Sequence, residues 1–179
     1  MKTMISRDNA YSDFYAIGKE ILTHPVYQRL KSYIHHGETS VFAHSVIVAY
    51  LAHRLSDRLS LDTNSVVRGA LLHDFFLYDW HEEGKRVRKP LLKKHGFKHA
   101  SYAMENATFY FTLNSIEKDI ISKHMFPLNM KPPVHLESWV VNLVDDYVTF
   151  FETFKNMKDD FRSLLQYVND RIADDLSLL

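Results

Sequence analysis

Long windows of apolar residues at helical spacing, nearly free of glycine and proline, constrain the fold of this 179-residue chain most strongly. Only 5 glycines and 5 prolines are present. This scarcity disfavours a many-turned β architecture, and the chain has no glycine-rich phosphate loop. The periodicity predicts helices over roughly residues 11–23, 25–34, 40–56, 65–76, 98–112, 115–125, 136–155 and 158–177, with an irregular, charged stretch over 77–97. We therefore predict an all-α chain folded as a single domain.

Helix-capping residues support three of these boundaries. Thr39 or Ser40 is an expected N-cap for the helix that follows, and Asn64 for the next one. Asn114 and Glu117 stand three residues apart before an apolar run, which is the spacing of a capping box.

Composition excludes several classes of function. The chain has no cysteine, which excludes disulfides, thiolate zinc sites, iron–sulfur clusters and a cysteine nucleophile. Lys+Arg and Asp+Glu both number 22, and this balance argues against a nucleic-acid polymer or a membrane surface as partner. No apolar run approaches the ~18 residues of a membrane span, and the N-terminus lacks an apolar signal core. We expect a cytoplasmic protein.

Polar residues interrupt three of the most apolar windows. His44 lies mid-helix, His73 and Asp74 close the next apolar helix, and Asp145 interrupts the apolar run 139–148. A buried carboxylate without a partner costs several kcal/mol or takes up a proton. Taken singly, each case has a simple structural interpretation: a hydrogen-bonded core histidine, a helix cap or an ion pair. Taken together, imidazoles and carboxylates from three helices are typical of a metal site in a bundle core.

Two further histidines extend this series. The chain has 11 histidines, and histidine is the commonest metal ligand. His99 stands at the start of a predicted helix and His124 at the end of another. Because an aspartate next to a histidine can bridge two ions, the ordered series predicts a dinuclear site. The candidate metal ligands are His44, His73, Asp74, His99, His124 and Asp145.

The order and local sequence of these residues resemble the HD-domain superfamily, whose motif is H…HD…D. The segments FAHSVIVA, RGALLHDF and VVNLVDDY look like the family's first-histidine, HD and last-aspartate helices. The resemblance covers about residues 36–155, which would form the domain core, flanked by N-terminal helices over 8–34 and a C-terminal helix over 158–177. His99 and His124 resemble the dinuclear branch, H…HD…H…H…D. Met125 follows His124 where members with a GYP signature carry a second histidine, which argues against cyclic di-GMP hydrolysis.

The resemblance implies a metal centre and a hydrolase. The first ion would be held by His44, His73, Asp74 and Asp145. Asp74 would bridge to a second ion held by His99 and His124, and the ions would be Fe, Mn, Ni or Zn. A metal-bridging hydroxide would then hydrolyse a small phosphate ester or nucleotide, which makes Asp74 the candidate catalytic residue. The alternatives are a mixed-valent diiron oxygenase of the inositol-oxygenase or phosphonate-cleaving type, and a non-enzymatic module that binds an anionic ligand or a partner.

Candidate substrate-binding residues flank the predicted ligands. Residues 85–98 contain seven lysines and arginines and no acid, and the stretch runs through Lys98 into His99. Beside a dimetal site it would suit a phosphorylated substrate, although a solvated charged loop is an equal interpretation. His35, His36 and Glu38 precede the His44 helix; if they fold over the metals, His36 or Glu38 would contact substrate, and otherwise they form a surface turn.

Lys123, beside His124, would neutralise an anion or face water. The aromatic stripe Tyr147, Phe150, Phe151 and Phe154 is expected in the core or in a contact between copies of the chain.

Overall fold

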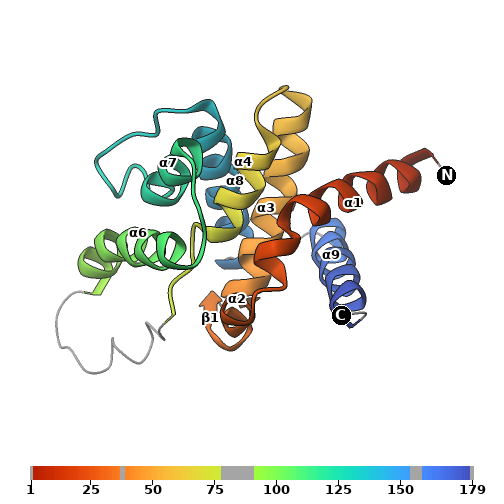
Figure 1. Cartoon of the computed structure of the whole chain (residues 1–179), viewed down its shortest axis with the longest axis horizontal. Helices are drawn as coiled ribbons and strands as arrows, with labels where there is room; N and C mark the ends of the chain where they lie inside the picture. Colours follow the sequence, from red (N-terminus) through yellow and green to blue (C-terminus); the bar gives the residue numbers. More distant parts are fainter. Residues whose placement is uncertain (1, 37–38, 78–90, 154–158, 178–179) are drawn as a thin grey trace.

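The computed structural model describes residues 2–36, 39–77, 91–153 and 159–177. Helices dominate this part of the chain, as predicted (Figure 1). In chain order the elements are α1 (Lys2–Leu22), α2 (Pro25–Gln28), the 3-10 helix η1 (Arg29–Ser32), β1 (Ile34–His36), β2 (Thr39–Ser40), α3 (Val41–Arg58), α4 (Thr63–Leu72), α6 (Leu91–Tyr110), α7 (Ser115–Lys123), α8 (Leu136–Thr153) and α9 (Asp159–Ser177).

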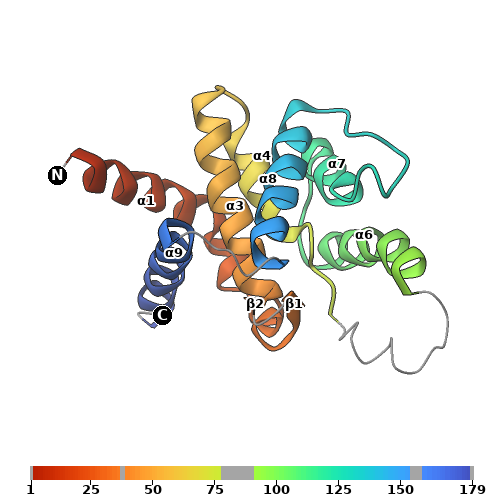
Figure 2. The ribbon, with the colours of Figure 1, turned by 180° about the vertical axis from the view of Figure 1, so that it is seen from behind.

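Helices α3, α4 and α8 form the centre of the molecule and pack against one another. Figures 1 and 2 show α6 and α7 on one side of this centre, with α1 and α9 on the other. Helices α3 and α4 are apolar nearly all round because they are covered on several faces at once, whereas Leu143, Tyr147 and Phe150 leave one face of α8 exposed. The all-α prediction is confirmed; within the described ranges the strands form one two-stranded antiparallel hairpin, β1–β2.

Large apolar side chains fill the space between these helices. Phe14 from α1, Tyr50 from α3 and Phe75 after α4 are fully buried. Tyr27 is also fully buried, and its hydroxyl donates a 2.8 Å hydrogen bond to the Leu71 carbonyl at the end of α4. The last turn of α4 is therefore anchored from two directions, by packing and by a buried hydrogen bond.

Two of the predicted caps are confirmed. The Ser40 side chain accepts a hydrogen bond from the Ala43 N–H at the start of α3. Asn114 and Glu117 form the reciprocal capping box of α7. The prediction of Asn64 as a cap is wrong: α4 begins earlier, at Thr63, because Asp62 accepts hydrogen bonds from Ser65 and satisfies the first turn.

Other predicted boundaries also differ, and α1 begins at Lys2 although the helix was expected from about residue 11. The helix expected over 65–76 ends at Leu72, because the His73 ring bonds back to the Ala70 carbonyl and the chain turns after it. Residues 91–97, expected to be irregular, belong to α6; their leucines and lysines favour a helix intrinsically. The helix expected over 25–34 divides into α2 and η1 before the hairpin.

Helices α4 and α7 approach closely at one glycine. A Cβ added at Gly69 would lie 2.7 Å from Ile120 Cδ1 and 3.1 Å from Ile120 Cβ. The absence of a side chain thus permits this contact, which sets the spacing between the helices that end at His73 and His124. No helix among the described residues has the length and apolar character needed to cross a bilayer.

Candidate metal centre

The six residues singled out from the sequence lie together in the interior. Each is at most 8% exposed, although they come from five separate segments of the chain. They are His44 from α3, His73 and Asp74 just after α4, His99 from α6, His124 just after α7 and Asp145 from α8. Three overlapping groups of nitrogen and carboxylate oxygen atoms in this region are compact enough to hold an ion, each with its atoms within 4.8 Å of one another.

Asp74 stands between two sets of histidines. Its Oδ2 lies 3.6 Å from His73 Nε2 and 4.0 Å from His44 Nε2. Its Oδ1 pairs with His99 Nε2 and lies 3.4 Å from His124 Nε2. The two oxygens of one carboxylate therefore face different imidazoles, which is the arrangement that a bridging carboxylate needs.

Asp145 closes the side of the cluster that contains His44 and His73. Its Oδ1 lies 3.0 Å from His44 Nε2 and 3.6 Å from His73 Nε2. Its neighbour Asp146 is exposed, as expected when successive side chains on a helix point about 100° apart. Only one member of the Asp145–Asp146 pair thus faces the histidines.

Backbone carbonyls hold two of the histidines in one orientation. The Nδ1–H of His73 donates to the Ala70 carbonyl at 2.6 Å, and that of His124 to the Ile121 carbonyl at 2.9 Å. In both rings the buried Nε2 has no hydrogen-bond partner among the described residues. An orphaned buried nitrogen is costly, whereas Nε2 with its lone pair directed inward is the usual metal-binding form of histidine. The donor set therefore fits a metal ion.

Asn142 of α8 anchors the segment that carries His124. Its buried side-chain amide donates to the carbonyls of His124 and Phe126, the latter at 2.9 Å. These carbonyls lie beyond the last turn of α7, where no helical partner is available. The amide thus ties the end of α7 to α8 and positions the His124 ring.

Two residues of the cluster, His35 and Glu152, were not assigned to it from the sequence. Glu152, in the last turn of α8, is 7% exposed, and its Oε2 lies 3.0 Å from His44 Nδ1. His35, in β1, is 8% exposed, and its Nε2 lies 3.0 Å from Asp74 Oδ2. The available signal for Glu152 was its spacing: it follows Asp145 by seven residues, which places both acids on one face of an otherwise apolar helix.

The electrostatics of the cluster keep its carboxylates ionised. Burial raises the pKa of Asp74 and Asp145, but the surrounding histidines outweigh it and hold both values well below the ordinary range. Burial lowers the pKa of His44, yet Asp145 and Glu152 on its two nitrogens raise it to about 10. Burial lowers the pKa of His124, which keeps that ring neutral. Ionised carboxylates with a neutral imidazole favour a cation.

For most of the residues predicted to bind substrate, the structure does not describe the side chain. Glu38 lies outside the described residues, as do residues 85–90 of the basic stretch, and for His36 and residues 91–98, which include Lys98, only the backbone is described, in β1 and α6. Lys123 is described: its Nζ pairs with Asp119 Oδ1 at 2.8 Å, one turn back along α7. This ion pair gives Lys123 a structural partner on its own helix.

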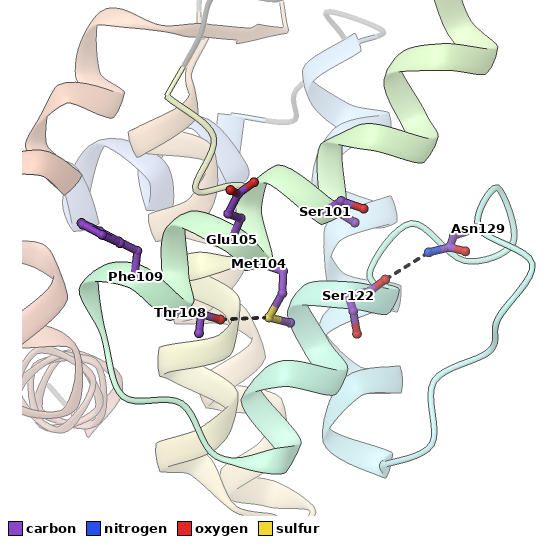
Figure 3. Close-up of a pocket in the computed structure, with 8 residues that line it drawn as sticks. Ser101, Met104, Glu105, Thr108, Phe109, Ser122 and Asn129 are labelled. Atoms are coloured by element: carbon purple, nitrogen blue, oxygen red, sulfur yellow. Dashed lines mark hydrogen bonds between the residues drawn. The ribbon is translucent and has the colours of Figure 1, made fainter.

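A surface cavity of about 670 Å³ lies between α6, the end of α7 and the loop after it. Figure 3 shows its lining side chains, among them Met104, Glu105 and Phe109 from α6 and Ser122 from α7. None of the lining residues belongs to the His/Asp cluster. The cavity and the candidate metal centre are therefore separate features.

Helices of this chain bury five histidines and three carboxylates in one cluster. This arrangement is typical of helical proteins that bind metal ions in their core. The model of the HD domain family matches residues 41–149, and the chain belongs to that family. The match contains His44, His73, Asp74, His99, His124 and Asp145.

Two proteins similar to this chain are named as a phosphohydrolase and as a phosphodiesterase. The chain is 35% identical over 66 residues to "Putative phosphohydrolase YueE" of Bacillus subtilis (strain 168); the alignment covers 37% of this chain and 34% of that protein. The chain thus matches about a third of the length of this relative. The HD domain of the L. monocytogenes phosphodiesterase PgpH is similar in fold, with a TM-score of 0.54 and 15% identity over 87% of this chain and 85% of that one. Neither relative supports the oxygenase alternative.

Proposed function

We propose that this protein is a metal-dependent phosphohydrolase that cleaves a small phosphate ester or nucleotide at the His/Asp cluster. The observation that carries the proposal is the position of Asp74, whose two carboxylate oxygens face two different sets of histidines. Two cations that share the Asp74 carboxylate would account for this arrangement. The names of the two relatives support hydrolysis of a phosphate ester as the reaction.

In this proposal, His44, His73, Asp74 and Asp145 would hold one ion, and Asp74, His99 and His124 would hold the other. Divalent ions at these positions would lower the pKa of water and neutralise the negative charge that develops on an attacked phosphate. Imidazole and carboxylate ligands suit iron, manganese, nickel and zinc alike, so the proposal includes all four metals.

The residues of the chain contribute orientation and charge. The carbonyls of Ala70 and Ile121 hold the rings of His73 and His124 with Nε2 directed into the site. The depressed pKa values of Asp74 and Asp145 keep these ligands ionised at neutral pH. The buried helices around them exclude bulk water, which strengthens each electrostatic interaction. Lys98, His36, Glu38 and Lys123 stay candidate contacts for an anionic substrate.

A paired set of variants tests the proposal. The metal-free protein is loaded in turn with Mn²⁺, Fe²⁺, Co²⁺, Ni²⁺ and Zn²⁺, and hydrolysis of phosphomonoesters, phosphodiesters and nucleotides is measured. Asp74→Asn and Asp145→Asn should lower kcat/KM by about 100-fold or more, since even residues that only support metal ligands cost 10–100-fold. Asp146→Asn, next to Asp145 but exposed, is the matched control and should retain activity.

The proposal fails if no loaded form hydrolyses any phosphate ester above the rate of the Asp74→Asn variant. It also fails if Asp145→Asn and Asp146→Asn have equal activity and equal metal content by elemental analysis.

A further inference from the structure

His35 lies in the short β1–β2 hairpin that precedes α3. The strands pair Ile34 with Ser40 and His36 with Thr39, and the register is irregular between Ile34 and His36. A bulge of this kind re-aims the side chain at its centre. Ile34 is 49% exposed whereas His35 is 8% exposed, so the hairpin turns the imidazole inward and leaves its apolar neighbour in solvent.

The hairpin is fixed to the start of α3, and this fixes His35 next to His44. The Val41 N–H donates a 2.8 Å hydrogen bond to the Tyr33 carbonyl. The His35 and His44 rings stack with their centroids 3.8 Å apart and their planes 23° apart. The two imidazoles therefore lie almost parallel and face the same surroundings.

One carboxylate contacts the same edge of both rings. Glu152 Oε2 lies 3.0 Å from His44 Nδ1 and 3.6 Å from His35 Nδ1. The opposite edges face the cluster: His44 Nε2 lies 3.0 Å from Asp145 Oδ1, and His35 Nε2 lies 3.0 Å from Asp74 Oδ2. A carboxylate on Nδ1 with Nε2 directed at the site is the support that metal-binding histidines commonly have.

We propose that His35 is an additional histidine ligand of the metal centre, and that Glu152 positions the rings of His35 and His44 together. The donor set on the Asp74 Oδ2 side then comprises His35, His44, His73, Asp74 and Asp145. The inference rests on the proposed metal-dependent function, but it concerns a residue outside the H…HD…H…H…D series. His35, His44 and Asp74 together form one of the three groups compact enough to hold an ion.

Cobalt binding tests the assignment without an activity measurement. The metal-free protein is titrated with Co²⁺ against a competing chelator, and visible absorption reports the coordination of the bound ion. His35→Gln should weaken the affinity of one Co²⁺ site by about 10–100-fold and change its spectrum, while the other site keeps its affinity. Glu152→Gln should weaken the same site by about 10-fold, in the range expected for supporting residues. His135→Gln, at a histidine outside the cluster, is the control and should bind as wild type does.

A count of ligands in the wild-type protein keeps the test valid if His35→Gln does not fold. With ring-labelled histidine, Co²⁺ should shift the NMR signals of five imidazoles strongly. Four strongly shifted imidazoles, or a His35→Gln variant with wild-type affinity and spectrum, would overturn the inference while leaving the proposed function intact. A wild-type protein that binds no Co²⁺ would overturn both.

Discussion

The contact between α4 and α7 at Gly69 predicts how a single methyl group should disturb both the fold and the metal centre. A Cβ at this position would lie 2.7 Å from Ile120 Cδ1 and 3.1 Å from Ile120 Cβ and Cγ2. Carbon atoms prefer about 3.5–4.0 Å, so the helices must separate by roughly 0.5–1 Å. Three atoms of one buried side chain are involved, including the Cβ bound to the backbone, so a rotamer change cannot relieve the contact.

The expected loss of stability follows from two opposing terms. Overpacking of a buried contact costs about 1–3 kcal/mol, and because no rotamer change relieves this contact we take the upper part of that range, about 2–3 kcal/mol. Replacing glycine by alanine within a helix recovers about 1 kcal/mol. Gly69→Ala should therefore lower the free energy of unfolding by about 1–2 kcal/mol, which corresponds to a fall in Tm of about 2–8 °C for a chain of this size. Because α4 leads into His73 and α7 into His124, the variant should also bind Co²⁺ less tightly.

Gly18 provides the matched control for the same substitution. A Cβ at Gly18 would lie 2.9 Å from Leu71 Cδ1, the end of a flexible side chain that can rotate away. Gly18→Ala should therefore stay within about 0.5 kcal/mol of wild type or become more stable. Urea denaturation of the metal-free proteins measures both variants.

A double-mutant cycle identifies the responsible contact. Ile120→Val removes the Cδ1 atom and should destabilise the wild type by about 1 kcal/mol, but it should cost at least ~0.5 kcal/mol less in the Gly69→Ala background. A Gly69→Ala protein as stable as wild type, or a cycle with strictly additive effects, would refute the reasoning.

Three further predictions concern the same region. Asn142→Leu should cost about 1–3 kcal/mol, because it leaves the carbonyls of His124 and Phe126 without their buried donor, and it should weaken Co²⁺ binding. Burial raises the pKa of Asp119, but Lys123 and other donors outweigh it and lower the pKa to about 2 from 3.8. The ionised Asp119 therefore stabilises the fold above about pH 4, and this stabilisation is lost as the pH falls through 2. In urea denaturation, Asp119→Asn should cost about 2 kcal/mol at pH 7, and the difference from wild type should shrink toward pH 2. Mn²⁺ at 100 times its Kd should stabilise the wild type by about 2.7 kcal/mol in thermal denaturation and leave the Tm of Asp74→Ala unchanged.

The sequence predicts the helical class and the convergence of six polar residues for a common reason. His44 and Asp145 interrupt strongly apolar stretches of helix, and such stretches are mostly buried. A polar group at a buried position needs a polar partner, so several of them in one small core must lie near one another. This argument needs no knowledge of how the helices are connected.

The boundaries around Asp74 could not be predicted in the same way. The apolar run continues through Phe75 and Phe76, and both are fully buried, so periodicity alone extends the helix through them. The chain turns instead because the His73 ring donates a hydrogen bond to the Ala70 carbonyl and the Phe76 N–H donates one to the Asp74 carbonyl. Tertiary contacts of the site decide this boundary, and local propensity does not.

The remaining members of the cluster, Glu152 and His35, show what decides whether a buried polar residue can be assigned to the cluster from sequence. Glu152 lies on the face of α8 that carries Asp145, two turns further on, and helical geometry alone links them. His35 has no such link, because its inward direction comes from a bulge in a strand of three residues. Its neighbours His36 and Glu38 carry equally plausible ligand groups, so the sequence alone does not single out His35. A member of the cluster on a regular helix is thus predictable from spacing, whereas a member on a hairpin requires the three-dimensional structure.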